Sequence, residues 1–376
     1  MTPTRPLKGV VDLSDRFRHI PVWLVLIIAC VAAVTSARVW SDRGAGLVVG
    51  AFCVADGIML CLLPRLGRSF GPPQLPWISL ILIRFILALL LAMVPEPAAL
   101  PAMFVVQIGL WCIALYACWV EPMQLGVSRV NIRTSRLMGC PPLRILQISD
   151  LHVERITARE RRLLEAVAEL RPDIVAITGD FVNISYTDDM EAIKQTRQLL
   201  DQLAALSGVF IVRGSPSVDP PELIAQLSTG LGVKWLRDEV ASFDWHGCCL
   251  QIAGVECSYD LQDDEMRLQR VLDGRAEECY TILLYHTPDL MPAAAQIGVD
   301  LYLAGHTHGG QLRLPKYGAL VTASRFGKRF EMGCYEQDKT TLYVNRGVGL
   351  EGKGAPRARF LCPPEIALFT LGADGP

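Results

Sequence analysis

The sequence predicts an α/β protein that is preceded by an all-α transmembrane segment of four helices. Three observations support this fold class. The first third of the chain is apolar and poor in charge, with nine Lys and Arg and six Asp and Glu before Met123, against 27 and 32 from there on. The remainder alternates short apolar runs with amphipathic stretches, and residue types that bind metals follow several of those runs. A net charge of -2 gives no reason to expect a nucleic-acid partner.

Four apolar runs in the first third are each long enough to cross a hydrocarbon core of roughly 30 Å. We therefore predict a transmembrane anchor over residues 1–122 and a soluble domain over residues 123–376. A buried helical domain is the alternative, but four such runs in succession exceed what a soluble core uses. A cleaved signal peptide is not expected, because further apolar runs follow the first. The runs cover residues 20–37, 46–63, 77–94 and 98–120.

The distribution of Lys and Arg predicts the orientation of the anchor. With four spans, the N-terminus and the loop after the second span share one side of the membrane. That side holds six basic residues, whereas the opposite side holds only Arg38 and Arg43. The positive-inside rule then predicts a multi-pass protein of the inner (cytoplasmic) membrane whose soluble domain faces the cytoplasm. The six basic residues are Arg5, Lys8, Arg16, Arg18, Arg65 and Arg68.

Two charged residues, Asp56 and Arg84, fall within the predicted spans. Ionisable groups in a membrane are costly and often functional. No neighbouring sequence resembles a transport pathway, so we expect the two to pair with each other or to face the interior of the helix bundle.

The twelve cysteines are scattered, with no CxxC pair and no regular spacing. This pattern favours reduced intracellular thiols over a disulfide framework. The adjacent Cys248 and Cys249 lie in a strand-like run, where packing is the expected role.

After about Met123, short apolar runs alternate with amphipathic segments, which predicts a βαβαβ order followed mostly by strands. The first half indicates a partly parallel sheet, and the second half a further mixed or antiparallel sheet. Helices are predicted at residues 157–170, 188–206 and 220–228. Strands are predicted at residues 143–149, 174–178, 209–213, 240–243, 249–255, 281–285, 301–304, 312–314, 342–345 and 366–371.

Metal-ligand residue types follow four of these predicted strands. Asp150 and His152 are two residues apart, as are His306 and His308, and this spacing lets both members of a pair reach one ion from extended backbone. Asp180 and His286 follow two further strands. Sites in such sheets collect at the carboxyl ends of the strands. A single histidine there has most simply a structural role, but the combination predicts a metal centre.

Mixed imidazole and carboxylate ligands suit Mn, Fe or Zn better than Ca or Mg. One carboxylate can bridge two ions roughly 3.5–4 Å apart. Such a pair generates a hydroxide at neutral pH and clamps the attacking and leaving oxygens of an in-line displacement at phosphorus.

These motifs resemble those of the calcineurin-like metallophosphoesterases, specifically the bacterial branch with N-terminal transmembrane helices. The resemblance covers residues from about 130 to 371. As a set the motifs are highly specific for the family, and the run at residues 304–311 would be a strong indication alone. They are residues 148–152 (ISDLH), 178–180 (TGD), 285–289 (YHTPD) and 304–311 (AGHTHGGQ), together with 343–349 (YVNRGVG) and 364–366 (PEI).

The resemblance implies two packed mixed β-sheets flanked by helices, and it implies roles for the residues. Asp150, His152 and His308 would hold one divalent metal, His286 and His306 the second, and Asp180 would bridge them, with a metal-bridging hydroxide as nucleophile. Asp150, Asp180 and His306 are the predicted catalytic residues. The implied activity is hydrolysis of a phosphodiester or pyrophosphate bond in a phosphorylated small molecule or lipid. Diacylated UDP-sugars are substrates in the broader family.

One block departs from the family pattern, in which Gly-Asn-His precedes Asp or Glu. Here Ser215 stands where the ligand Asn is expected, and Pro216 stands where the His is expected. Ser215 or the nearby Asp219 could substitute as a ligand, but Pro216 cannot donate a proton. General acid–base help is typically worth about 10²–10⁴-fold, so its loss affects substrates with poor leaving groups most. The alternative is a catalytically impaired relative that binds a phosphorylated ligand or a partner.

Overall fold

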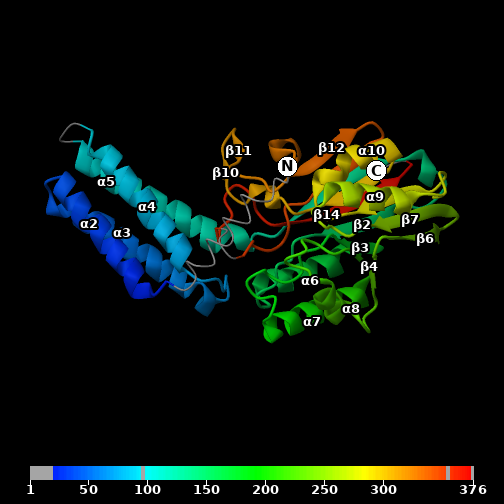
Figure 1. Ribbon diagram of the computed structural model, residues 1–376, viewed down its shortest axis with the longest axis horizontal. Coiled ribbons are helices and arrows are strands. Elements are labelled where there is room, and N and C mark those ends of the chain that lie inside the picture. Colours follow the sequence, from blue (N-terminus) through cyan, green and yellow to red (C-terminus); the bar gives the residue numbers. More distant parts are fainter. Residues whose placement is uncertain (1–19, 95–97, 353–355, 374–376) are drawn as a thin grey trace. The chain divides into compact units, whose positions relative to one another are not determined.

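The computed structural model describes residues 20–94, 98–352 and 356–373 (Figure 1). The chain divides into two compact units, Met1–Glu121 with Glu351–Arg359, and Pro122–Leu350 with Phe360–Pro376. This division lies next to the predicted boundary after residue 122, which stays a proposal. Four basic residues used to predict the orientation, Arg5, Lys8, Arg16 and Arg18, lie outside the described residues.

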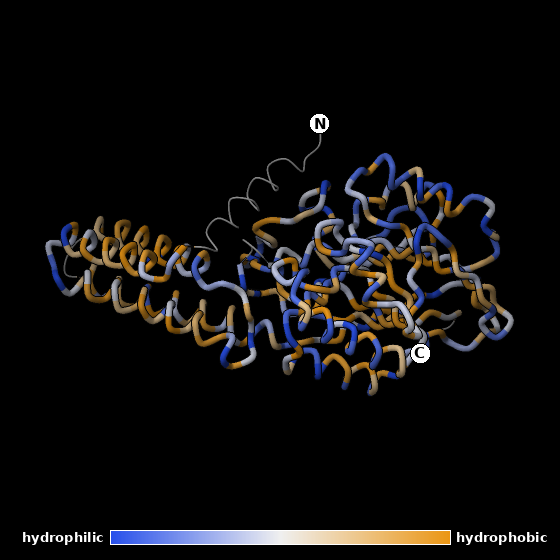
Figure 2. Tube along the Cα trace, turned by 60° about the horizontal axis from the view of Figure 1, so that its bottom comes forward, coloured by the Kyte–Doolittle hydropathy of each residue, from blue (hydrophilic) through white to orange (hydrophobic). Residues whose placement is uncertain are grey.

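The first unit contains the four predicted apolar helices, each long and apolar enough to cross a membrane. The hydropathy colouring shows apolar residues along their length (Figure 2). The surface of these helices is apolar, because large apolar side chains such as Leu47 and Val105 remain exposed. The helices are α2 (Val22–Val39), α3 (Arg43–Leu62), α4 (Gln74–Leu91) and α5 (Ala99–Leu115), and the last continues through irregular turns to Met123.

Asp56 and Arg84 pair inside this helix bundle, as expected. The Arg84 guanidinium donates to both Asp56 oxygens, at 2.6 and 2.8 Å, and both side chains are fully buried. Gln107 completes the network, because its side-chain oxygen accepts from Arg84 and its amide donates to the Arg84 carbonyl. One residue from each of α3, α4 and α5 is thus joined in a single polar cluster.

The second unit is built on two six-stranded mixed sheets, which confirms the predicted fold class. The first sheet has a parallel core of four strands, with β14 antiparallel to β2 and β1 parallel to β14 at one edge. Its strand order is β1 (Gly126–Arg133), β14 (Glu365–Gly372), β2 (Leu143–Ile148), β3 (Ile174–Ile177), β4 (Gly208–Ile211) and β5 (Val233–Trp235).

The second sheet also has a parallel centre, with antiparallel strands at its two edges. Its strand order is β12 (Gly333–Gln337), β13 (Thr340–Val344), β9 (Leu301–Ala304), β8 (Tyr280–Leu284), β7 (Cys248–Gly254) and β6 (Glu239–Trp245). A separate two-stranded hairpin is formed by β10 (Arg313–Leu314) and β11 (Gly318–Ala319).

Strand alternation explains how the layers pack. In β2, Leu143 and Ile145 enter the core between the two sheets, whereas Leu146 and Ile148 face the helices. The central strands are apolar on both faces because each face is covered, as expected for buried parallel sheets. The helices α6 (Ala158–Leu170), α7 (Met190–Leu206) and α8 (Pro221–Ser228) pack on the first sheet, and α9 (Leu261–Leu272) and α10 (Met291–Ile297) pack on the second.

Several elements were not predicted from the sequence. Strand β1 is half-exposed at a sheet edge and includes Arg129 and Arg133, so it lacks an apolar run. Helix α9 is rich in charge, and its apolar face is narrow; it is fixed by the Asp260 side chain, which accepts from the backbone N–H groups of Gln262 and Asp263. Tertiary packing, more than local pattern, stabilises such elements.

The prediction of reduced thiols is wrong for four of the cysteines. Cys140 is bonded to Cys248, and Cys249 to Cys279. Successive strand residues point to opposite faces, so the adjacent cysteines of β7 reach different partners. The partners lie 108 and 30 residues away along the chain, with Cα–Cα distances of 6.3 and 4.6 Å, so spacing alone could not reveal them.

We expect Cys140→Ser to lower the free energy of unfolding of the second unit by about 2–5 kcal/mol, because the Cys140–Cys248 bond restricts a long loop in the unfolded chain. Urea denaturation measures this change. Thiol titration of the denatured, unreduced chain should count eight free cysteines, and twelve after reduction. Cys334→Ser, which removes an exposed free thiol, is the matched control. Twelve thiols before reduction would contradict the two bonds.

Candidate metal centre

The six predicted ligands come together at the carboxyl ends of strands from both sheets. Asp150 and His152 follow β2, Asp180 follows β3, His286 follows β8, and His306 and His308 follow β9. Their donor atoms form two groups, in each of which all atoms lie within 4.8 Å of one another. The groups are Asp150 with His152 and His308, and Asp180 with His286 and His306.

Within the groups, pairs of imidazole nitrogens face each other closely. His152 Nε2 lies 3.1 Å from His308 Nε2, and His306 Nδ1 lies 3.1 Å from His286 Nε2. Two lone pairs that converge at this distance repel unless a proton or a cation lies between them. The donor set therefore fits divalent metal ions, and its mixed nitrogen and oxygen atoms suit Mn, Fe or Zn.

Asp180 belongs to the second group and also faces the first. Its Oδ2 is 3.4 Å from His286 Nε2 and 3.6 Å from His152 Nε2, so a single oxygen faces one histidine of each group. The other carboxylate, Asp150, belongs to the first group, with Oδ1 3.5 Å from His308 Nε2. This is the arrangement that a bridging carboxylate requires.

Neighbouring groups orient the ligands. His286 Nδ1 lies 2.7 Å from the Thr178 carbonyl oxygen, which only accepts, so this nitrogen carries the proton and Nε2 is left for a metal. Ser149 Oγ donates to Asp150 Oδ2 at 2.6 Å, and the His306 N–H donates to the same carboxylate. Gln147 ties the two sheets together beside the centre by donating to the Ala304 carbonyl.

The backbone at the centre is in an uncommon conformation. Five of the six predicted ligands have a positive φ, between 40 and 69°, and are not glycine. Such conformations cost about 1–3 kcal/mol each when sparsely populated, and they cluster at functional sites. Asp and His adopt them more readily than most residues. The five are Asp150, His152, Asp180, His306 and His308.

The geometry favours Ser215 over Asp219 as the substitute ligand. Ser215 Oγ lies 3.1 Å from both Asp180 Oδ2 and His286 Nε2, among the donor atoms. The Asp219 carboxylate instead accepts from the backbone N–H groups of Asp180, Phe181 and Gly214, at 2.6, 3.1 and 2.9 Å. Asp219 therefore holds the two loops that carry Asp180 and Ser215.

Sequence reasoning missed Tyr259, which follows the carboxyl end of β7. Its hydroxyl donates to Ser215 Oγ at 2.7 Å, and its ring lies 5.8 Å from that of His306. The residue has a φ of 66° and is 41% exposed. A single tyrosine in a loop does not match any metal-ligand pattern. Only its position after β7, in the same sheet as β8 and β9, could have suggested that Tyr259 lies near the predicted ligands.

The members of the second group shift one another's pKa. Burial would raise the pKa of Asp180, but His286 and His152 hold it well below its usual range. Burial would lower the pKa of His286, but the Asp180 carboxylate raises it to about 10. Burial, with the charge of His286, lowers the pKa of His306 to about 3. With its pKa raised this far, His286 carries a second proton on Nε2. A metal ion that binds Nε2 must displace that proton, so binding releases protons.

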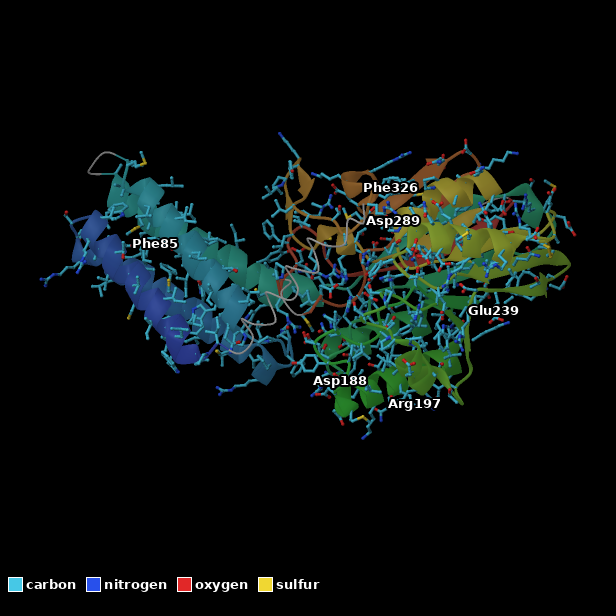
Figure 3. All side chains as sticks on the ribbon, viewed as in Figure 1. Phe85, Asp188, Arg197, Glu239, Asp289 and Phe326 are labelled. Carbon is cyan, nitrogen blue, oxygen red and sulfur yellow. A yellow bond between two sulfur atoms is a disulfide. The ribbon has the colours of Figure 1, made fainter. Side chains whose placement is uncertain are left out.

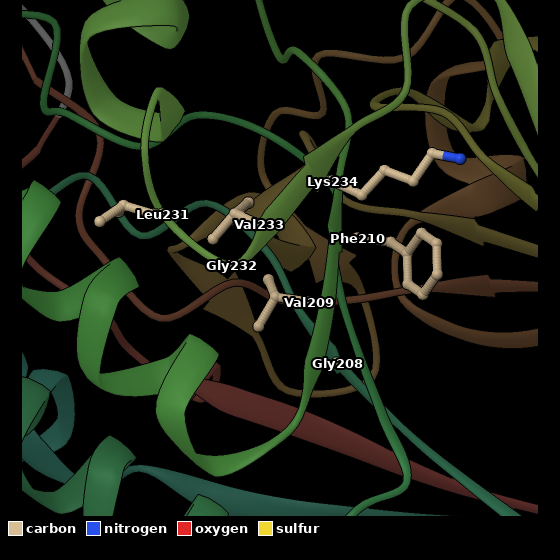
Figure 4. Close-up of a pocket in the computed structure, with 7 residues that line it drawn as sticks. All are labelled: Gly208, Val209, Phe210, Leu231, Gly232, Val233 and Lys234. Carbon is tan, nitrogen blue, oxygen red and sulfur yellow. The ribbon is translucent and has the colours of Figure 1, made fainter.

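A shallow surface pocket elsewhere carries no comparable chemistry. It lies where β4 and β5 begin, at the opposite end of β4 from Ser215 (Figure 4). Its lining includes Gly208, Phe210 and Leu231, and Lys234 is its one titratable residue. The metal centre is therefore the better candidate for catalysis.

Comparison with known proteins agrees with this geometry. Residues 143–215 match the model of the calcineurin-like phosphoesterase family. An uncharacterized metallophosphoesterase of Aquifex aeolicus is 30% identical over 273 residues, which cover 68% of this chain and 95% of that protein. The chain belongs to the calcineurin-like metallophosphoesterase family. The predicted resemblance is thereby confirmed, and the enzyme class is that of phosphoric ester hydrolases.

Two further relatives extend the comparison of this metallophosphoesterase. The uncharacterized metallophosphoesterase YkuE of Bacillus subtilis is 29% identical over 262 residues, covering 68% of this chain and 88% of that protein. The UDP-2,3-diacylglucosamine pyrophosphatase LpxG of Chlamydia trachomatis is 25% identical over 315 residues, covering 68% of this chain and 92% of that protein. Both similarities span most of the relative's length.

Gly214 has a specific steric role that can be tested. A Cβ at this position would fall against Asp180 Oδ1, far inside van der Waals contact, and close to Asp219 Oδ2. We expect Gly214→Ala to displace Asp180 and to weaken metal binding by about 10–100-fold, as losses in the support of metal ligands do. Metal titration by calorimetry measures the affinity. Gly232→Ala, whose Cβ meets Ala204 at an ordinary 3.6 Å, is the control. Equal affinities of the two variants would contradict this role.

Proposed function

We propose that this metallophosphoesterase is anchored in a membrane and uses two divalent ions to hydrolyse a phosphodiester or pyrophosphate bond. The observation that carries the proposal is the convergence of six ligand residues in two groups around Asp180. We assign Asp150, His152 and His308 to one ion, His286 and His306 to the other, and Asp180 to both. Ions held there would supply an activated water at neutral pH and charge stabilisation at phosphorus.

The protein's own residues set up this chemistry. Thr178 fixes the tautomer of His286 through its carbonyl oxygen, and Ser149 orients Asp150. Asp219 fixes the loops of Asp180 and Ser215 by accepting from the backbone N–H groups of Asp180 and Gly214. The ligand atoms are therefore placed before substrate arrives, which avoids reorganisation during the reaction.

Tyr259 is the residue that we assign to the missing histidine. Pro216 cannot donate a hydrogen bond, whereas the Tyr259 hydroxyl is a donor that already reaches Ser215 among the ligand atoms. Its partial exposure leaves it accessible to substrate. In this proposal its hydroxyl donates to the oxygen of the leaving group. The Ser215 and Tyr259 pair supports a complete site over the alternative of an impaired relative.

A lipid substrate best explains why one chain combines four apolar helices with a phosphoesterase domain. Four helices could hold the enzyme at a membrane, and the LpxG relative acts on a diacylated UDP-sugar pyrophosphate. A pyrophosphate or a phosphodiester next to acyl chains presents the charge that two metal ions bind. The shared chemistry is therefore a phosphorylated, membrane-borne molecule.

The multi-pass inner-membrane location and the cytoplasmic orientation stay predictions. The charge distribution supports the cytoplasm. The two disulfides support the opposite side, since such bonds persist in oxidising compartments and are rare in the cytosol.

Activity should depend on metal and on Asp180. We expect the full chain in detergent, stripped with a chelator, to hydrolyse bis(4-nitrophenyl) phosphate only after Mn is restored, and Asp180→Ala to lose this activity to background because the ligand shared by both ions is gone. Release of nitrophenolate is the measurement. Asp201→Ala, at an exposed position of α7, is the control. Full activity in Asp180→Ala would overturn the proposed site.

The role of Tyr259 predicts a dependence on the leaving group. Tyr259→Phe should lower kcat by about 10²-fold for phosphodiesters with alkyl leaving groups, and far less for nitrophenyl esters, because activated leaving groups need little proton donation. Steady-state kinetics over a series of esters measures how kcat depends on the leaving group. Tyr317→Phe, a tyrosine that is 59% exposed, is the matched control. A uniform loss across the series would indicate a structural role instead.

Orientation can be decided with reporters fused after residue 376. The charge distribution leads us to expect a fluorescent cytoplasmic reporter to be active and an alkaline phosphatase reporter to be inactive. The reverse result would place the soluble domain on the oxidising side, where its cysteine pairs would remain bonded.

A further inference from the structure

We propose that residues 312–330, named here the basic hairpin segment, form a docking surface for an anionic phospholipid bilayer. The segment contains the hairpin of β10 and β11 and ends in a short turn, Gly327–Phe330. It follows directly after the run that carries His306 and His308, yet none of its residues is among the proposed metal ligands. Lipid contact here is an interaction separate from hydrolysis.

The charge of the segment is of one sign. It contains five Lys and Arg and neither Asp nor Glu, in a chain whose net charge is -2. The buried Glu331, just beyond the segment, pairs with Arg313 at 2.8 Å and with Lys328 at 3.7 Å. The ion pairs among the described residues do not include the other three basic residues, which are exposed: Lys316, Arg325 and Arg329. Positive charge therefore remains for anionic headgroups.

Large apolar side chains are exposed beside these charges. Leu314, Tyr317 and Leu320 are 47, 59 and 50% exposed, and Val321 is 70% exposed. The Lys328 ammonium lies 3.4 Å from the centre of the Tyr317 ring, so charge and aromatic surface are presented together. Aliphatic and aromatic tips flanked by Lys and Arg are typical of protein surfaces that insert into the boundary between headgroups and acyl chains.

The segment is firmly attached to the loop of the metal centre. Arg313 donates to the Gly309 carbonyl at 2.7 Å, and Gly310 approaches Ala319 so closely that it has no room for a Cβ. At the other end, the Asp289 carboxylate accepts from Ser324 Oγ at 2.7 Å and from the Arg325 N–H, next to Phe326 (Figure 3). A bilayer held by the segment therefore lies beside the loop of His306 and His308.

The combination favours lipid over other partners. Single-stranded nucleic acid would use the positive charge and the ring of Tyr317, but it would leave the aliphatic Leu320 and Val321 without a role. The apolar residues are few and lie on a two-stranded hairpin and its continuation, which is too small for a stable protein interface. Insertion into a lipid surface uses both the aliphatic tips and the charges.

Hydrogen exchange of the full chain in lipid nanodiscs tests this surface. We expect amides of residues 314–321 to exchange more slowly in discs that contain phosphatidylglycerol than in discs of phosphatidylcholine alone, with the difference reduced by salt. Peptides from the central strands β2 and β8 report whether the fold is intact. Equal exchange of residues 314–321 in both kinds of disc and in detergent would overturn the proposal.

Variants separate the charged and apolar contributions. Lys316→Glu with Lys328→Glu should remove the difference between the two kinds of disc, and Leu320→Ser with Val321→Ser should reduce protection in both. Lys194→Glu, which reverses an exposed lysine on α7, should change neither. If soluble heparin in detergent protects residues 314–321 to the same extent as phosphatidylglycerol discs do, the segment is a general polyanion site and the lipid assignment is wrong.

Discussion

The metal centre depends on the position of one carboxylate, that of Asp180. Its Oδ2 faces a histidine from each ligand group, and its Oδ1 accepts from the Ser215 N–H at 2.7 Å. Its own N–H is held by Asp219. The loops after β3 and β4 are thus joined to each other through Asp180 and Asp219. Moving this carboxylate would separate the two predicted ligand groups, each of which contains residues from both sheets.

The two sheets meet at this carboxylate because both have parallel centres. Parallel strands direct their carboxyl ends to one edge, so β2 and β3 of one sheet and β8 and β9 of the other deliver their loops to the same place. The polar Gln147, in the otherwise apolar layer between the sheets, donates to the Ala304 carbonyl and so fixes the register beside the centre. A strained backbone at five of the predicted ligands is tolerated because the adjoining sheets are well packed.

The sequence was sufficient for the features that repeat a local pattern. The buried strands are runs of apolar residues, and the six predicted ligands follow strand ends, so both could be read from the chain. The expectation that each pair reaches one ion from extended backbone is wrong for His306 and His308, which lie in different groups. The backbone of both pairs has a positive φ and is not extended. Tyr259 could not, because its role comes from a contact with Ser215 that is 44 residues away. The disulfides were missed for the same reason, since Cys248 and Cys249 select partners through strand geometry. The replacement of Asn by Ser was visible, but its setting among the ligand atoms was not.

The polar cluster of Asp56, Arg84 and Gln107 has a consequence for how the protein is made. In the proposed membrane-spanning arrangement, α3 would emerge before α4 during synthesis, so Asp56 would enter the membrane before its partner exists. An unpaired charge at the centre of a span costs about 2.5–3.5 kcal/mol in translocon insertion. Helix α3 would therefore either remain in the translocon until α4 arrives or enter the lipid together with it. Insertion of the proposed anchor would then be cooperative, with the helices partitioning as a group.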